Sequence, residues 1–157
     1  SFMHQYFKSS LLDGADAIPE GHYEEENMKS TVVPFRNGIM LAIATGIAES
    51  HELKRVYIAN HGGDHTIYPD CRLEFIHAMN GATEAGTFVK VRVEAPYTEI
   101  TKTEIVARGA ALGIDYSKTW SCYKGADIHC GKCGTCVERK EAFEAAGVKD
   151  PTIYSKD

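Results

Sequence analysis

The stretch Cys122-Tyr-Lys-Gly-Ala-Asp-Ile-His-Cys130-Gly-Lys-Cys133-Gly-Thr-Cys136 holds four of the five cysteines of this 157-residue chain. Two Cys-x-x-Cys units overlap in it and share Cys133. Such units bring thiolates to one metal ion, and four thiolates close a tetrahedral zinc site. The spacing therefore predicts one structural zinc ion per chain. Its ligands would be Cys122, Cys130, Cys133 and Cys136.

Other uses of these cysteines stay open from the sequence. A redox pair can also use a Cys-x-x-Cys unit. An iron–sulfur cluster is a further alternative, although such runs have different spacing and a trailing Cys-Pro. His129 could replace a thiolate, but four cysteines suffice, so we interpret it as a loop residue. For the distant Cys71 we expect a buried, unreactive thiol.

Regular elements are predicted on both sides of the cysteine run. A helix is expected from about Thr135 to Ala146. Upstream, Thr101 and Glu104 have the spacing of a capping box, which predicts a helix that continues to Leu112. The segment between the two helices shows no periodicity. Within it, we interpret Trp120 as a core side chain.

Further upstream, helical and strand-like patterns alternate. The run from Pro34 to Leu53 is apolar at most positions, which predicts a helix buried on most sides. Val56–Ala59 is typical of a buried parallel strand, and Phe88–Val93 alternates like a half-buried one. A helix from Cys71 to Met79 separates the two strands, and Asp13–Met28 is predicted to be a loop. This order favours an α/β fold.

Composition and charge exclude several classes of protein. The chain has 17 basic and 22 acidic residues, a formal net charge of −5, which argues against broad nucleic-acid binding. Its longest apolar stretch, Gly38–Ala48, is shorter than the roughly 20 residues of a membrane span. We see no charged-then-apolar leader, so we expect no secretory signal and a cytoplasmic location.

Four blocks of this sequence carry a family resemblance. In chain order they are Val33–Gly38, Asp64 with Tyr68–Arg72 and Glu74–Phe75, Lys102–Val106, and the cysteine block from Thr119 with Arg139, Ala142 and Phe143. Together they resemble the 7-cyano-7-deazaguanine synthases of queuosine biosynthesis, an ATP-pyrophosphatase type. The resemblance implies an adenine-nucleotide-hydrolase-like (Rossmann-like) parallel sheet with helices on both faces. Residues 1–157 would form the C-terminal part of that single domain, with a zinc-binding segment at 119–139.

The resemblance also implies an activity. Enzymes of this family are ATP-dependent ligases that convert 7-carboxy-7-deazaguanine and ammonia to the nitrile 7-cyano-7-deazaguanine, for tRNA modification. The full-length enzyme would need ATP and Mg²⁺ in addition to the zinc ion. A homodimer is expected from the family, and neither nucleic acid nor membrane is expected as a partner.

Seven side chains in these blocks are candidates for binding substrate or nucleotide: Arg36, Asn37, Asp64, Tyr68, Asp70, Arg72 and Lys102. The cations and the asparagine could meet phosphate or carboxylate near helix starts. The aspartates could accept hydrogen bonds from a guanine edge or hold Mg²⁺, and the tyrosine could stack on the base. Helix caps, turns, ion pairs and plain packing remain structural alternatives. No catalytic residue is assigned.

One family element is absent from these 157 residues. The family's Ser-Gly-Gly-x-Asp-Ser loop binds nucleotide phosphates, and Gly62-Gly63-Asp64 does not match it. Since the start at Ser1 is also unlike an initiation site, we expect the chain to lack the first βα units and to be inactive alone. Two alternatives stay open: a zinc-stabilised binding module without catalysis, and ATP-dependent modification of another base.

Overall fold

The computed structural model describes residues 2–14, 18–22, 25–125 and 127–156. The chain divides into two compact units. Unit 1 comprises Ser1–Pro34 and Lys102–Asp157, and unit 2 is the intervening Phe35–Thr101. The interpretation of residues 1–157 as part of a single domain stays a prediction.

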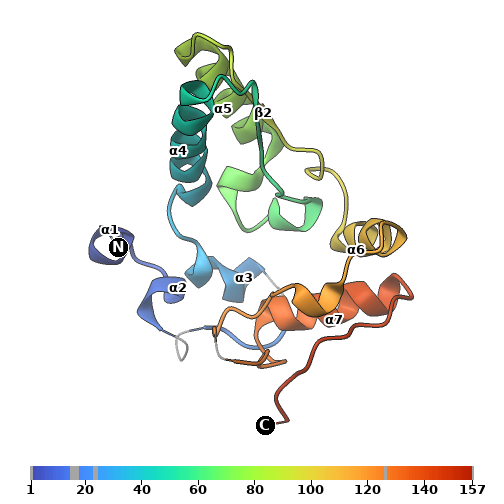
Figure 1. Cartoon of the computed structure of the whole chain (residues 1–157). Coiled ribbons are helices and arrows are strands. Elements are labelled where there is room, and N and C mark those ends of the chain that lie inside the picture. Colours follow the sequence, from blue (N-terminus) through green and yellow to red (C-terminus); the bar gives the residue numbers. More distant parts are fainter. Residues whose placement is uncertain (1, 15–17, 23–24, 126, 157) are drawn as a thin grey trace. The chain divides into compact units, whose positions relative to one another are not determined.

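Unit 2 alternates helices and strands in the predicted order (Figure 1). Its main elements are α4 (Arg36–Ser50), β1 (Arg55–Tyr57), α5 (Leu73–Gly86) and β2 (Arg92–Glu94). The 3-10 turns η3 (Gly62–Asp64) and η4 (Pro69–Cys71) lie in the loop between β1 and α5. The two strands are parallel, with Val56 opposite Val93, which confirms an α/β unit with a small parallel sheet.

The core of unit 2 lies on one face of this sheet. Leu41 of α4, Ile76 of α5 and Val93 of β2 are buried against one another. On the opposite face, Tyr57 of β1 is 66% exposed. Among the described residues of unit 2, the helices therefore cover one face of the sheet and not both, because α4 and α5 pack side by side.

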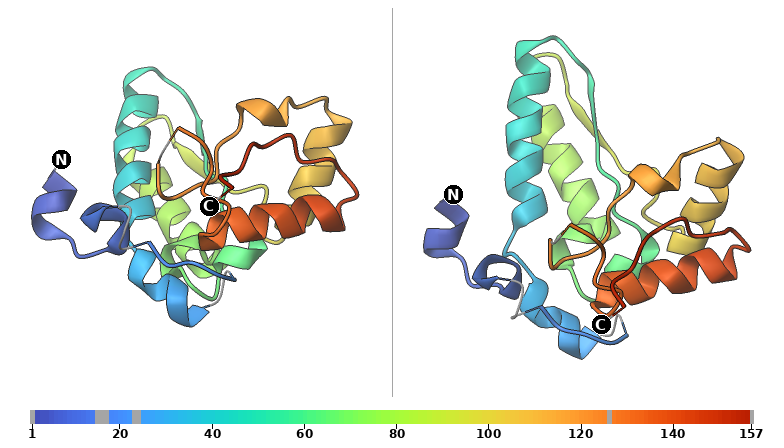
Figure 2. Two further views of the ribbon diagram at one scale, coloured as in Figure 1. Left: turned by 90° about the horizontal axis from the view of Figure 1, so that it is seen from below. Right: turned by 60° about the horizontal axis from the view of Figure 1, so that its bottom comes forward.

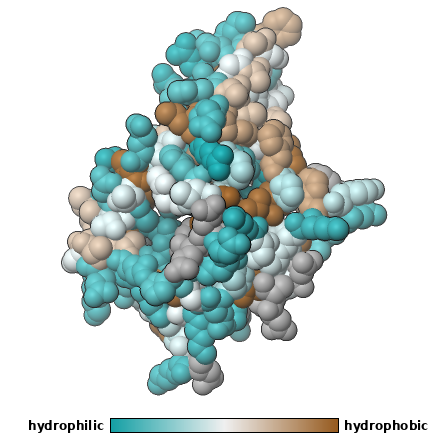
Figure 3. All heavy atoms as spheres, turned by 180° about the vertical axis from the view of Figure 1, so that it is seen from behind, coloured by the Kyte–Doolittle hydropathy of each residue, from teal (hydrophilic) through white to brown (hydrophobic). Residues whose placement is uncertain are grey.

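The apolar sequence of α4 does not produce a helix buried on most sides, as was predicted. Leu41 and Ala48, seven positions apart, face the core and are buried. The equally apolar Met40, Ile43 and Ile47 are each more than half exposed. Their spacing of three and four positions puts them on one face of the helix, and Figure 3 shows apolar side chains at the surface on one side of the molecule. The hydropathy pattern did not distinguish the two faces.

The strand predicted over Phe88–Val93 is paired only at its end. Its alternation is confirmed, since Val91 and Val93 are buried and Arg92 is exposed. However, the backbone N–H of Phe88 donates to Glu49 and that of Val91 donates to Thr87. Side-chain oxygen atoms thus accept hydrogen bonds from backbone N–H groups that would have paired with a neighbouring strand if β2 were longer.

Unit 1 is mostly helical. Its described elements are α1 (Phe2–Tyr6), α2 (Ser10–Asp13), α3 (Glu25–Met28), η2 (Lys29–Thr31), α6 (Lys102–Ala111), η5 (Tyr116–Lys118) and α7 (Gly134–Ala145). The last two predicted helices are confirmed as α6 and α7, whereas α3 lies in a segment predicted to be a loop. Val106, Ala142 and Phe143 form the core between α6 and α7. After α7 the chain turns and runs back beside that helix (Figure 2).

Candidate functional site

The four cysteines predicted as metal ligands meet in unit 1. Their sulfur atoms all lie within 4.8 Å of one another, and the Sγ atoms of Cys130 and Cys136 are 4.0 Å apart. Zinc with Zn–S bonds of about 2.3 Å would hold its tetrahedral sulfur ligands roughly 3.8 Å apart. A disulfide needs about 2.0 Å, and all four cysteines are free. The arrangement fits a metal ion, and these residues could hold one.

The backbone around the cluster directs N–H groups at the sulfurs. The N–H of Cys130 donates to Cys122 Sγ at 3.4 Å, and that of Cys133 donates to Cys130 Sγ at 3.3 Å. Such hydrogen bonds favour the thiolate, which is the metal-binding form. The turn between Cys130 and Cys133 depends on Gly131, whose φ is +72°. A Cβ there would lie 3.1 Å from Lys140 Nζ, tighter than most packed contacts, and 3.4 Å from the Cβ of Tyr154.

The cluster is enclosed, which makes its charge costly without a cation. Cys133 and Cys136 are fully buried, and Ile18 packs against them. The neighbouring sulfur groups of Cys133 and Cys136 influence each other, which lowers the pKa of Cys133 and raises that of Cys136. Burial raises the pKa of Cys130. Four thiolates can share this dry space only with a bound cation, so the donor set favours a closed metal site.

The N-terminal part of the chain contributes to this cluster, which sequence reasoning missed. Glu20 forms an antiparallel bridge with Cys133, and the N–H of Gly21 donates to the carbonyl of Lys132 at 2.8 Å. The carboxylate of Glu20 also pairs with Lys124. Only the apolar Ile18 beside Pro19, in a polar stretch, signalled that this segment packs on something.

A buried arginine organises the chain beside the cysteines. Arg139 of α7 is 5% exposed. Its guanidinium donates to the carbonyl of Tyr116 at 3.2 Å, to Thr119 Oγ1 at 2.9 Å and to Asp150 Oδ1 at 3.3 Å. The signal for this role was helical spacing, because Arg139 lies between Cys136 and Phe143 on one buried face.

The carboxylate of Asp150 holds the C-terminal segment to this arginine. It accepts hydrogen bonds from Tyr154 Oη at 2.6 Å and from the N–H of Thr152 at 3.1 Å. Burial raises the pKa of Asp150, but these hydrogen bonds and the charge of Arg139 outweigh burial and leave the pKa below its usual value. Arg139 and Asp150 therefore fasten the segment after α7 to the segment before the cysteines.

In unit 2 the structure brings together Asn37 and Asp70, two of the candidate binding residues. Asp70 Oδ2 accepts from the backbone N–H of Asn37 at 2.9 Å and so caps the start of α4. The Asn37 side chain donates to the Asp70 carbonyl at 3.1 Å and to Cys71 Sγ at 3.2 Å. Burial raises the pKa of the Cys71 thiol to about 12, as expected of an unreactive cysteine.

The other candidates have mainly structural contacts. Asp64 pairs with His61 within the first turn of η3, and Tyr68 is buried. Arg72 Nε donates to the carbonyl of His65 at 2.9 Å. Arg36 is exposed at the start of α4.

Lys102 belongs to unit 1, whereas the other six candidates belong to unit 2. Its ammonium pairs with the carboxylate of Glu138 on α7. This ion pair offsets the electrostatic disadvantage of a lysine at the start of α6.

Comparison with known proteins places these features in a family. Residues 1–147 match the family model described as queuosine biosynthesis protein QueC. The chain belongs to the QueC family. It is 66% identical to a 7-cyano-7-deazaguanine synthase of Porphyromonas gingivalis over 98% of its own length. It is also 55% identical to one from Hahella chejuensis over 93%, and 52% identical to one from Desulfotalea psychrophila over 98%.

This QueC-family chain corresponds to part of those relatives' length. It spans 70% of the Porphyromonas and Desulfotalea proteins and 63% of the Hahella protein. The family match includes the cysteine cluster, Arg139 and the Asn37–Asp70 pair. In the described residues, no helix is both long and apolar enough to cross a membrane.

Proposed function

We propose that this QueC-family protein is a 7-cyano-7-deazaguanine synthase of queuosine biosynthesis. The observation that carries the proposal is the 66% identity to a relative of that name over 98% of the chain. The reaction would join 7-carboxy-7-deazaguanine to ammonia at the expense of ATP. A cytoplasmic location, a homodimer and the Rossmann-like sheet of the whole enzyme belong to the same proposal.

The chemistry needs two activations of one carbon atom. The substrate carboxylate attacks the α-phosphate of ATP and releases pyrophosphate, which gives an acyl-adenylate. Ammonia then displaces AMP and leaves an amide. A second ATP-driven activation of the amide oxygen removes that oxygen and two protons, which leaves the nitrile. The site must therefore stabilise phosphate charge and exclude water from the activated intermediates.

The described residues support parts of this scheme. A zinc ion held by Cys122, Cys130, Cys133 and Cys136 would have no open position, so its role would be structural. Arg36 is the candidate that keeps an exposed cation at a helix start for phosphate or carboxylate. Asp64 and Asp70 already accept hydrogen bonds within unit 2, so Mg²⁺ would enter chiefly with the ATP phosphates.

The activity test uses the protein expressed from its complete gene, loaded with zinc. With 7-carboxy-7-deazaguanine, ammonia and MgATP, mass spectrometry should detect the nitrile, and omission of ammonia should abolish it. The 157-residue chain alone should form none, since it contains no Ser-Gly-Gly-x-Asp-Ser loop. Failure of the complete, zinc-loaded protein to form the nitrile would overturn the proposed function.

A further inference from the structure

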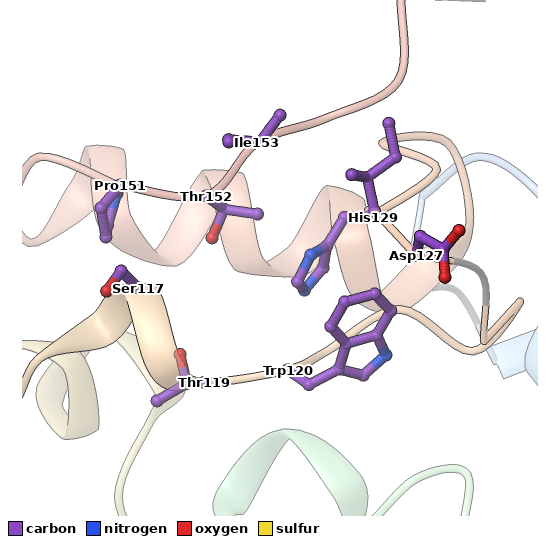
Figure 4. A pocket seen from close by; sticks show the side chains of 9 residues that line it. Ser117, Thr119, Trp120, Asp127, His129, Pro151, Thr152 and Ile153 are labelled. Carbon is purple, nitrogen blue, oxygen red and sulfur yellow. The ribbon is translucent and has the colours of Figure 1, made fainter.

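A cavity of about 210 Å³ opens in unit 1 beside the cysteine cluster (Figure 4). Three chain segments line it, around Trp120, His129 and Thr152. Two of these segments continue directly into metal ligands, because Trp120 lies two residues before Cys122 and His129 directly precedes Cys130. None of the seven binding candidates taken from the sequence lines this cavity.

Trp120 presents a fixed aromatic surface in this cavity. The indole Nε1–H donates to the carbonyl of Cys122 at 2.8 Å. The ring of His129 lies against it, with centroids 4.1 Å apart and planes inclined by 36°. Trp120 is nevertheless 51% exposed, so it is not the core residue that was expected. An exposed and immobilised tryptophan is a stacking platform for a flat ring.

His129 is held as firmly as its neighbour. Within the described part of the chain the group that could hold a metal consists of the four cysteines, so His129 is a loop residue as interpreted, and it is 5% exposed. Its Nε2 accepts from the N–H of Ser121 at 3.0 Å, and its ring meets that of Tyr154 edge-on. The histidine therefore backs the tryptophan with a buried, hydrogen-bonded ring.

The remaining wall is tied to the same framework. Arg139 holds Thr119 on one side of the cavity, and through Asp150 it holds Thr152 on the other. Thr152 Oγ1 is buried and has no hydrogen-bond partner among the described residues. Such an orphaned hydroxyl is costly unless a ligand or water meets it. The cavity thus has preformed walls and an unused polar group.

The polar lining favours one kind of ring. Asp127 lies at one end of the cavity, near the Trp120–His129 pair (Figure 4). A carboxylate only accepts hydrogen bonds. A 2-amino-4-oxopyrimidine ring, as in guanine and 7-deazaguanine, offers two adjacent N–H donors, whereas the adenine of ATP offers a donor beside an acceptor. The volume is below the roughly 300–1,000 Å³ of pockets for drug-sized ligands, which suits one bicyclic base.

We propose that this cavity binds the deazaguanine ring of the substrate, with Trp120 stacking on the ring and Asp127 accepting from its N–H groups. This inference rests on the proposed function. It assigns substrate recognition to the segment that the metal cluster stabilises. The adenine of ATP is also a flat nitrogen heterocycle and could stack on the same tryptophan. The experiment therefore distinguishes binding of the deazaguanine from binding of adenine.

The first measurement is binding, which needs no turnover. The zinc-loaded complete protein is titrated with 7-carboxy-7-deazaguanine while its tryptophan fluorescence is recorded. The signal of Trp120 is obtained by subtracting the fluorescence of the Trp120→Phe variant from that of the wild type. Saturable quenching of this difference signal is expected. Quenching by ATP alone, with none by the deazaguanine, would place adenine in the cavity and overturn the proposal.

The second measurement separates the two substrates by kinetics. Trp120→Ala should raise the KM for 7-carboxy-7-deazaguanine about tenfold or more, with the KM for ATP unchanged. Trp120→Phe keeps a stacking ring and should stay within a few-fold of wild type. Asp127→Asn, which replaces one acceptor by a donor, should also raise only the first KM. Leu112→Ala is the control, because this side chain is 79% exposed and does not line the cavity.

Metal content and circular dichroism confirm that each variant folds before it is scored. If the wild type forms the nitrile but Trp120→Ala and Asp127→Asn keep its KM values, the cavity assignment is wrong and the proposed function stands. If the wild type forms no nitrile but the deazaguanine quenches the fluorescence of Trp120, the cavity assignment stands and the proposed function is wrong.

Discussion

The two units of the molecule are stabilised by different kinds of interaction. Unit 2 buries aliphatic side chains from two helices against a parallel strand pair, as Leu41, Ile76 and Val93 show. In unit 1, Val106, Ala142 and Phe143 pack between α6 and α7, and a further cluster among the described residues consists largely of cysteines. There, four clustered cysteines and an ion pair between the buried Arg139 and the half-buried Asp150 take the place of apolar packing.

Because of this difference, we expect the stability of the two units to respond differently to loss of metal and to a change of pH. Aliphatic packing is insensitive to metal and only weakly dependent on pH, because no ionisable group takes part. A thiolate cluster and an ion pair depend on both, because their contribution is lost when a ligand or a carboxylate is protonated. Amide hydrogen exchange can test this contrast, because peptides from the two units are read separately.

The largest effect should follow loss of the metal. Cys133→Ser removes a fully buried ligand and should abolish zinc binding, and apparent binding energies of structural zinc are about 10–16 kcal/mol. Peptides of unit 1 should then exchange rapidly, while the core peptides of unit 2 stay protected. Cys71→Ser, outside the cluster, should retain about one zinc ion per chain. Normal protection of unit 1 in metal-free Cys133→Ser would refute a structural metal site.

A core truncation in unit 2 should give the reverse pattern. Leu41→Ala should destabilise unit 2 by about 2–5 kcal/mol, since it leaves a cavity against Ile76 and Val93. Exchange should accelerate in unit 2, and zinc content should not change. Ile43→Ala, on the exposed face of the same helix, should cost less than about 0.5 kcal/mol. Equal effects of the two substitutions would contradict the one-sided burial of α4.

The smallest effect should come from the ion pair, and it should depend on pH. Asp150→Asn should destabilise unit 1 by about 1–3 kcal/mol at neutral pH, because a charge-assisted hydrogen bond is lost. The folded pKa of Asp150 lies below the ordinary value of 3.8. Its contribution is therefore complete above that value and disappears as the pH falls through the folded pKa.

The test compares the melting temperatures of the wild type and Asp150→Asn at several pH values. Their difference should be constant from neutral to mildly acidic pH and should narrow below about pH 4. The exposed Glu144→Gln serves as the control for removal of an acidic side chain. A difference that grows on acidification would show that Asp150 does not carry this linkage.

The sequence predicted the parts of the molecule whose information is local. The four cysteines that cluster in the structure lie within one short run, and α6 and α7 have clear helical patterns and glycine stops. The exposure of Trp120 and the one-sided burial of α4 were not predicted. Both depend on which segments pack against a residue, and an apolar side chain looks the same in sequence whether it is covered or not.

The hydrogen-bond partners of polar side chains were harder to predict than the cysteine cluster. Asp70 was considered for a substrate or Mg²⁺, but its carboxylate caps α4 through Asn37, 33 residues earlier in the chain. Arg139 was noted only as part of a family block, and its partners lie at distances from 11 to 23 residues along the chain. Pairings of this kind follow from the folded arrangement and not from spacing.

Unit 1 is assembled from two stretches of chain, residues up to 34 and residues from 102 onward, whereas unit 2 is continuous. During synthesis on the ribosome, all of unit 2 is made before Cys122, the first cysteine of the cluster. The bridge between Glu20 and Cys133 can close only after that, across the whole of the intervening unit. Binding of a metal ion by the four cysteines would therefore be a late step of biogenesis, and a nascent chain without metal would contain a complete unit 2 and an unclosed cysteine cluster.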